Sequence, residues 1–268
     1  MPRFSANLST LFTDRPFLDR VSAAAGVGFK AVEVQFPYHL DRDAFGDALA
    51  EYRLSLVLCN APPGDWEAGE RGLAALPGRE EEFRDGLDLA FDWCNALKCQ
   101  RLHVMAGIVD LDDPDVLEDA YDAYLRNIAY AAAQGEARGV KVLIEPINGV
   151  DMPGYFLQRP DDAVRVLDEV DHRNLFLQYD LYHAQMTQGG LTDFLEGNLH
   201  RIAHMQVAGV PGRHEPDANG EINFPYLFNL IDAHGYAGWI GCEYRPRINT
   251  IAGLRWAREW GIGQDHKA

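Results

Sequence analysis

Four oxygen-bearing side chains close four consecutive apolar segments in the second half of the chain: Glu145, Asp180, Gln206 and Glu243. A buried carboxylate must be paired with a cation or bound to a metal, and the segment ends carry no lysine or arginine at the same level. Three carboxylates and one amide oxygen suit a hard divalent cation, whereas zinc prefers histidine and cysteine. The pattern therefore predicts one Mg²⁺ or Mn²⁺ ion held by these four side chains.

The charge of this predicted site points to residues that would bind a substrate. Three carboxylates and a divalent ion sum to −1, so an anionic substrate needs a fixed cation nearby. The interaction of two charges about 4 Å apart is worth on the order of 4 kcal/mol at an effective dielectric near 20. Arg213 and Arg71 lie in loops and can each clamp a carboxylate through two hydrogen bonds. His183, three residues past Asp180, and Asn7, which ends the first apolar segment, complete the expected substrate contacts.

Other polar residues in the apolar segments are better explained by packing. His204 lies deeper in its segment than Gln206, and we interpret it as a core histidine whose hydrogen bonds are satisfied. Glu33 and Gln35 share one face of their segment because strand side chains alternate. We expect both of them to pack or hydrogen-bond in a lower layer.

The elements that must position these residues repeat along the whole chain. Short segments rich in Val, Ile, Leu and Phe, typical of buried parallel strands, cover residues 2–7, 30–36, 54–60, 101–107, 140–146, 174–180, 201–208 and 238–244. Helical patterns lie between them; one covers 83–97, and another opens at Asp113 and Pro114 and closes at Gly139. Eight such repeats in about 250 residues match a (β/α)8 barrel, with the active site at the C-terminal strand ends.

An open nucleotide-binding sheet is the alternative, but it needs a glycine-rich turn after the first strand. That turn contains no glycine here. We therefore predict a single (β/α)8 TIM-barrel domain over residues 1–268. Leu254, Trp256 and Trp260 are expected to pack on the barrel rather than on a partner subunit. The oligomeric state stays open, with a homodimer or a higher assembly among the alternatives.

The composition limits the classes of partner and the compartment. The 268 residues include 24 Lys and Arg against 41 Asp and Glu, a formal charge of −17. Such a chain is a poor match for nucleic acid or for an anionic membrane surface, and no apolar run approaches the roughly 20 residues of a bilayer span. The N-terminus lacks a signal-peptide pattern, and the four cysteines show no metal or CxxC spacing. We expect a cytoplasmic protein with buried, reduced thiols.

The sequence resembles the hydroxypyruvate isomerase family, a branch of the xylose-isomerase-like barrels. The matching stretches span nearly the whole chain and cover residues 3–9, 63–66, 70–72, 77–84, 143–148, 178–180, 182–183, 220–223 and 241–244. The resemblance implies one divalent metal at Glu145, Asp180, Gln206 and Glu243, with Glu145 and Glu243 as the proton-transfer pair. Related sugar epimerases carry histidine where this chain has Gln206, so the glutamine marks the branch.

The same resemblance implies a reaction. Hydroxypyruvate and tartronate semialdehyde (2-hydroxy-3-oxopropanoate) differ by a hydrogen moved between C2 and C3, and a metal would stabilise the cis-enediolate that lies between them. A four-carbon 2-oxo-tetronate is an alternative substrate, ketose 3-epimerisation an alternative activity, and hydride shift an alternative mechanism. A DNA-repair endonuclease is disfavoured by the charge of −17 and the oxygen-rich ligand set. The glutamate pair argues against a barrel that only binds ligands.

Overall fold

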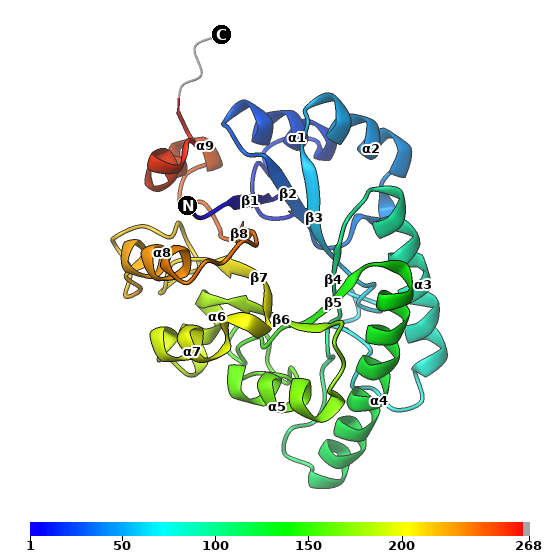
Figure 1. The fold of residues 1–268 in the computed structure, drawn as a ribbon. Coiled ribbons are helices and arrows are strands. Elements are labelled where there is room, and N and C mark those ends of the chain that lie inside the picture. The colour runs from blue at the N-terminus through cyan, green and yellow to red at the C-terminus, as the bar shows by residue number, and fades with distance from the viewer. Residues whose placement is uncertain (265–268) are drawn as a thin grey trace. The chain divides into compact units, whose positions relative to one another are not determined.

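The computed structural model describes residues 1–264, so the last four residues of the predicted domain lie outside it. Eight parallel strands follow one another in chain order around a closed barrel (Figure 1). The predicted barrel fold is therefore confirmed. The strands are β1 (Phe4–Asn7), β2 (Ala31–Val34), β3 (Ser55–Asn60), β4 (Arg101–His103), β5 (Lys141–Ile144), β6 (Leu175–Asp180), β7 (Ile202–Val207) and β8 (Ile240–Cys242).

Helices occupy the connections between the strands. They are α1 (Phe17–Gly26), α2 (Arg42–Glu51), α3 (Glu80–Ala96), α4 (Pro114–Arg138), α5 (Pro160–Val170), α6 (Leu181–Thr187), α7 (Leu191–Asn198), α8 (Phe224–Ala233) and α9 (Thr250–Gly253), with 3₁₀ turns η1 (Pro37–His39), η2 (Leu199–Arg201) and η3 (Leu254–Trp260). Within residues 1–264, none of these helices has the length and apolarity that crossing a membrane requires.

The observed strands are shorter than the predicted apolar segments at one or both ends. The segment 101–107 pairs only as far as His103, and the segment 238–244 only over Ile240–Cys242. Apolar character reports burial, and the chain stays buried for some residues after its ladder hydrogen bonds end. As a result, Glu145 and Glu243 lie directly after their strands rather than within them.

One compact unit contains residues 1–57, 180–200 and 204 onward. Its strands run β7-β8-β1-β2, with Gln206 and Ser5 both opposite Gly241, and Asn7 opposite Glu33. Because strand side chains alternate, this register places the polar residues of the four strands on one face. We call this part unit 1.

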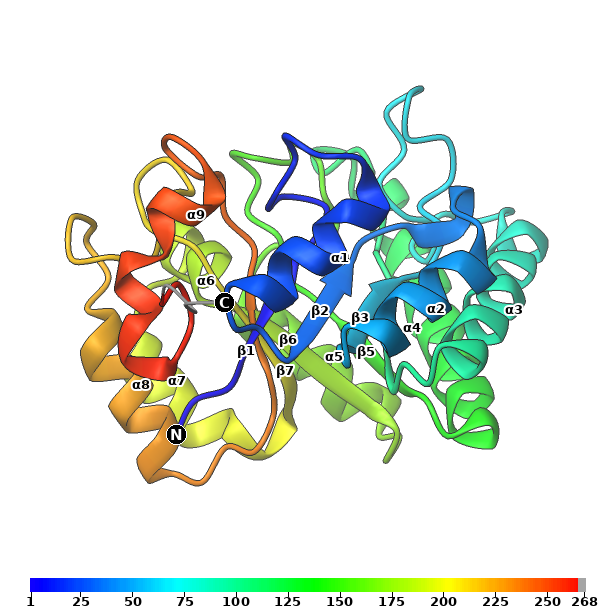
Figure 2. The ribbon, with the colours of Figure 1, turned by 90° about the horizontal axis from the view of Figure 1, so that it is seen from above.

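The C-terminal turn of unit 1 packs on its own chain, as the sequence predicts. The ring of Phe4 in β1 lies 5.1 Å from that of Phe228 in α8, and 5.2 Å from those of Trp256 and Trp260 in η3. Figures 1 and 2 show η3 and α8 close to the N-terminal strand. Leu254 is fully buried in the same region.

The second unit, unit 2, contains residues 58–179 and 201–203. In it α4 packs along both α3 and α5. The ends of α4 confirm the prediction: the Asp113 side chain accepts hydrogen bonds from the first turn, and Gly139 ends the helix at φ 70°, a left-handed conformation that glycine adopts easily.

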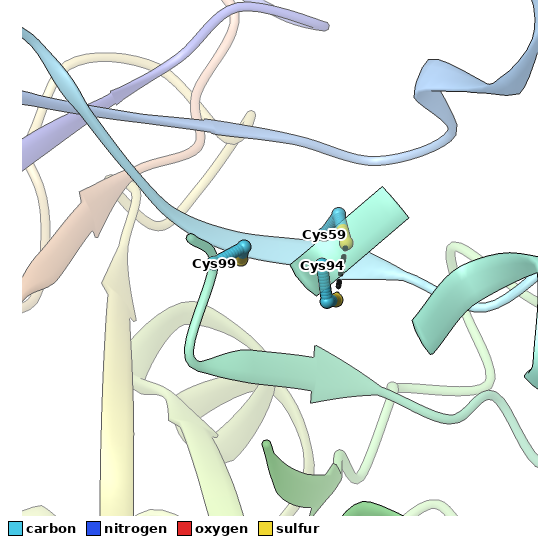
Figure 3. Close-up of side chains that lie close together, drawn as sticks. All are labelled: Cys59, Cys94 and Cys99. Carbon is cyan, nitrogen blue, oxygen red and sulfur yellow. Dashed lines mark hydrogen bonds between the residues drawn. The ribbon is translucent and has the colours of Figure 1, made fainter. Parts of the chain in front are cut away.

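Three cysteines of unit 2 lie together: Cys59 on β3, Cys94 on α3, and Cys99 just before β4 (Figure 3). Their sulfur atoms lie within 4.8 Å of one another, and those of Cys59 and Cys94 are 3.5 Å apart. Hydrogen bonding to the two neighbouring thiols and burial together raise the pKa of Cys59. All three side chains are buried, and buried free cysteines typically pack as small hydrophobic residues, so we interpret the trio as core packing. All four cysteines are free and buried, as expected.

Candidate metal centre

Three of the four predicted metal ligands belong to unit 1, and all three are buried. Asp180 ends β6 and caps α6: its Oδ1 accepts a hydrogen bond from the Tyr182 backbone N–H at 2.9 Å. That bond fixes the carboxylate at the junction of strand and helix. Gln206 lies one residue before the end of β7, and Glu243 comes directly after β8.

Arg213 joins two of these ligands. Its Nη2 lies 3.2 Å from Glu243 Oε1 and 3.6 Å from Asp180 Oδ2, and its guanidinium lies over the ring of Tyr182. Arg213 has φ 55°, a left-handed conformation that is uncommon for a residue with a Cβ atom. Such backbone strain is typical of residues at functional sites. The structure thus brings this predicted substrate contact to the predicted ligands.

Glu243 also binds Gln35, which donates a hydrogen bond from Nε2 to Glu243 Oε1 at 2.8 Å. Burial raises the pKa of Glu243 to about 7; Arg213 and Gln35 lower it in part, while Asp180 and Glu33 raise it. The prediction that Gln35 hydrogen-bonds is correct, but its place at the site was missed. The signal was available, because Gln35 follows β2 on the same face as Glu33.

Beneath these residues, Glu33 is the centre of a buried hydrogen-bond network. Ser5 Oγ and His204 Nε2 lie 2.8 Å from its Oε2, while Gln206 Nε2 at 2.8 Å and Asn7 Nδ2 at 3.1 Å contact its Oε1. Burial disfavours the charge on Glu33, but His204, Gln206 and Ser5 outweigh that cost and lower its pKa. His204 is therefore a core histidine, as predicted, but its hydrogen bonds are only half satisfied: Nε2 contacts Glu33, while Nδ1 is buried with no hydrogen-bond partner among the described residues.

The other two predicted substrate contacts of unit 1 lie next to these groups. His183 Nε2 is 3.7 Å from Asp180 Oδ2, and the His183 ring packs edge-on against Tyr182. Asn7 uses both ends of its amide within the chain, because its Oδ1 also accepts a hydrogen bond from the Ser9 backbone N–H at 3.0 Å. Asn7 therefore belongs to the hydrogen-bond network of Glu33, and its role as a substrate contact stays a prediction.

Unit 2 holds the fourth predicted ligand, Glu145, which follows β5 and is buried. Gln178 donates a hydrogen bond from Nε2 to Glu145 Oε2 at 2.8 Å, and His103 Nδ1 lies 3.4 Å from the same oxygen. Neither partner was predicted. Both are polar residues next to a leucine in their strands, His103 after Leu102 and Gln178 after Leu177, which was a usable signal.

Arg71, also in unit 2, serves its own loop. Its guanidinium lies 3.7 Å from the centroid of the Trp66 ring, and its Nη1 donates to the carbonyl oxygens of Trp66 at 2.9 Å and Glu70 at 2.6 Å. These contacts hold the loop after β3 in shape. A direct contact between Arg71 and a substrate stays a prediction.

The donor chemistry in unit 1 fits a hard divalent cation. The carboxylates of Asp180 and Glu243 converge on one cationic nitrogen of Arg213, so their oxygens already face a common positive charge. Gln206 turns its amide nitrogen to Glu33, which directs its Oε1 away from that carboxylate. Oxygen donors of this kind suit Mg²⁺ or Mn²⁺.

Comparison with known sequences identifies related proteins. A family model described as xylose isomerase-like TIM barrel matches residues 21–260. A 2-oxo-tetronate isomerase from Cupriavidus necator is 50% identical, covering 97% of this chain and 99% of its own. The hydroxypyruvate isomerase of Escherichia coli is 43% identical, covering 96% of this chain and 98% of its own.

Solved structures give the same fold. A crystal structure described as AP endonuclease, family 2, from Brucella melitensis superposes with a TM-score of 0.94 at 46% identity, covering 97% of this chain and 99% of that one. A D-psicose 3-epimerase from Clostridium cellulolyticum H10 superposes with a TM-score of 0.76 at 15% identity, covering 91% of this chain and 85% of that one. The latter likeness concerns the fold.

Proposed function

The chain belongs to the xylose isomerase-like TIM barrel family and is an isomerase, and from this premise we propose that it interconverts hydroxypyruvate and tartronate semialdehyde by proton transfer. One observation carries the proposal: Asp180 and Glu243 share the guanidinium of Arg213, and in the same unit the Gln206 amide donates to Glu33. The arrangement combines oxygen donors, a carboxylate able to move a proton, and a cation for an anionic substrate.

We assign the metal ligands as Glu145, Asp180, Gln206 and Glu243. A bound Mg²⁺ or Mn²⁺ ion would polarise the carbonyl and hydroxyl oxygens of the substrate and favour loss of a proton from carbon. The carboxyl ends of all strands of a (β/α)8 barrel face one end, which supports grouping residues that follow β5, β6, β7 and β8.

Glu145 and Glu243 are the proposed proton-transfer pair. One glutamate accepts the proton from C3 of hydroxypyruvate, giving the cis-enediolate of the substrate. A proton is then delivered to C2, and the hydroxyl proton on O3 moves to O2, which leaves the aldehyde at C3. A nearby positive charge favours the ionised form of a carboxylate, so a bound divalent cation would keep the accepting glutamate ionised and able to take the proton.

Arg213 and His183 would orient the substrate. A guanidinium can clamp a carboxylate through two parallel hydrogen bonds, and Arg213 lies next to Glu243. His183, adjacent to Asp180, is placed to hydrogen-bond a substrate oxygen. Together they would hold the acid with its reacting carbons towards Glu243.

A four-carbon substrate is the second candidate, and a specific observation favours it: the relative at 50% identity is a 2-oxo-tetronate isomerase. Both substrates carry a carboxylate beside a carbonyl group, so the same roles for Arg213 and Glu243 apply. What differs is the space needed for one further hydroxylated carbon.

The endonuclease description of the Brucella melitensis structure concerns that protein. For the present chain, the formal charge of −17 opposes binding to a phosphate backbone. We therefore propose a small hydroxy-oxo acid as its partner rather than a nucleic acid or a membrane. The four free, buried cysteines support a reducing compartment, which we propose to be the cytoplasm.

A metal-controlled assay tests the proposal. The protein is stripped with a chelator, dialysed and reloaded with Mg²⁺ or Mn²⁺, and kcat/KM is measured for hydroxypyruvate and for 2-oxo-tetronates. We expect activity to require the reloaded ion and to favour one of the two acids. In the same assay, Glu196→Gln, at an exposed position of α7, is the control for the loss of one carboxylate in Glu243→Gln. Full activity in chelator, or turnover of neither acid, would contradict the proposal.

A further inference from the structure

Glu33 makes more hydrogen bonds than any role in simple packing requires. Its two oxygens receive four contacts, from Ser5 and Asn7 on β1 and from His204 and Gln206 on β7, all within unit 1. The side chain is fully buried. Four donors on two carboxylate oxygens hold the group in one position, because any rotation breaks several bonds at once.

The neighbouring strand is shaped to admit this carboxylate. Gly241 on β8 lies opposite both Ser5 and Gln206 in the sheet register. A Cβ atom at position 241 would lie 2.3 Å from each Glu33 oxygen, far closer than van der Waals contact. The missing side chain at Gly241 thus lets Glu33 reach from β2 across β1 and β8 to Gln206 on β7.

The contact between Glu33 and Gln206 determines whether the nitrogen or the oxygen of the Gln206 amide faces Glu33. An ionised carboxylate only accepts hydrogen bonds, so it selects the amide nitrogen and repels the amide oxygen. The oxygen of Gln206 is then directed to the opposite side. A metal ion has the reverse preference, because it binds the oxygen of an amide and not its nitrogen.

We propose that Glu33 is a positioning residue that locks the Gln206 amide with its oxygen presented to the metal. The inference rests on the proposed function, since it takes Gln206 as a ligand. Partners of this kind, which hold a ligand from behind, typically change metal affinity by 10- to 100-fold when they are removed. Glu33 would act entirely through Gln206, without touching the ion or the substrate.

A double-mutant cycle on Mn²⁺ affinity tests this, with free Mn²⁺ measured by EPR in the full-length protein. Glu33→Gln offers both a donor and an acceptor, so it no longer selects the amide nitrogen of Gln206. We expect Glu33→Gln to weaken Mn²⁺ binding by 10- to 100-fold. In a Gln206→Ala background, the same change should cost no further affinity, because nothing remains to be oriented.

Ser5→Ala is the matched control. It removes another donor from the same carboxylate but leaves the contact between Glu33 and Gln206 in place. We expect its Mn²⁺ affinity to stay within about twofold of that of the wild type. A purely structural role for Glu33 predicts instead that both changes weaken Mn²⁺ binding to similar degrees, and that Glu33→Gln still weakens it in the Gln206→Ala background. Those results would overturn the inference.

The cycle also separates this inference from the proposed function. If Gln206→Ala leaves Mn²⁺ affinity unchanged, the ligand assignment is wrong and the inference falls with it. If Gln206→Ala weakens binding while Glu33→Gln does not, only the positioning role is wrong.

Should Glu33→Gln fail to fold, the wild-type protein provides a test by NMR. The side-chain N–H protons of Gln206 should exchange slowly with solvent both before and after Mg²⁺ is added, because the nitrogen stays on Glu33 while the oxygen binds the ion. Loss of this protection on adding Mg²⁺ would contradict the positioning role.

Discussion

The Nη2 atom of Arg213 lies 3.2 Å from the Oε1 atom of Glu243, so the proposed anchor for the substrate carboxylate touches the proposed proton-transfer group. The two residues come from different loops, and these loops are joined two residues after Glu243, where the Arg245 N–H donates to the Arg213 carbonyl oxygen at 2.7 Å. A substrate whose carboxylate is held by Arg213 would therefore have its reacting carbon, only a few bonds from that carboxylate, close to Glu243.

Arg213→Gln should mainly weaken substrate binding. Hydrogen bonds to charged groups contribute about 1.5–3 kcal/mol each, so we expect KM for hydroxypyruvate to rise by roughly 10- to 100-fold, with a smaller change in kcat. Steady-state kinetics in the presence of Mg²⁺ measures both. Arg245→Gln, at an exposed neighbouring position, should leave KM within about twofold of the wild type. Equal effects of the two substitutions would exclude Arg213 as the specific anchor.

Glu243→Gln keeps the size of the side chain but removes the carboxylate of the proposed proton-transfer group. General acid–base catalysis contributes about 10²- to 10⁴-fold, and we expect kcat to fall by that factor. In D₂O, the wild-type enzyme should incorporate solvent deuterium at carbon during turnover, as proton transfer requires. Complete retention of the substrate hydrogen would point to hydride shift instead.

Much of the architecture was predictable because it depends on local patterns. The caps of α4 at Asp113 and Gly139 follow from side-chain and backbone chemistry within a few residues. The four predicted metal ligands follow from a rule that applies to every (β/α)8 barrel, namely that active-site residues stand at the carboxyl ends of the strands. Three of them lie in unit 1.

The missed features depend on contacts between distant strands. Sequence parity places Gln35 and Glu33 on one face, but it does not reveal that Gln35 reaches Glu243, 208 positions away. The network around Glu33 also depends on sheet register, which sets Gly241 between Ser5 and Gln206. Register follows from the packing of the whole barrel, so a single sequence does not display it.

The stability of the metal-free protein should depend on the charge of Glu243. Burial raises its pKa from 4.5 to about 7 in the folded state, so the folded protein holds this proton more tightly than the unfolded chain does. The resulting stabilisation is fully present below pH 4.5, falls as the pH rises towards 7, and is lost above it. The loss should be on the order of 3 kcal/mol, since one pKa unit corresponds to about 1.4 kcal/mol.

Urea unfolding in chelator between pH 4.5 and 8 measures this dependence, with Glu243→Gln as the reference that cannot titrate. We expect the free energy of unfolding of the wild type, relative to that of Glu243→Gln, to decrease over this range and then level off. A relative stability that rises with pH would show that the pKa of Glu243 is lowered rather than raised.

Gly241→Ala should destabilise the fold because of Glu33. The added methyl group would meet both carboxylate oxygens at 2.3 Å, and overpacking of a core typically costs about 1–3 kcal/mol. Combined with Glu33→Ala, which removes those oxygens, the same glycine substitution should cost much less, so that the two changes are strongly non-additive.

Gly197→Ala is the control, because position 197 lies in α7 and a Cβ there has no atom within 4 Å. Alanine is favoured over glycine in a helix by about 0.5–1 kcal/mol, so the control should be neutral or stabilising. Urea unfolding of the four proteins gives each free energy, and additive effects of Gly241→Ala and Glu33→Ala would contradict the close contact.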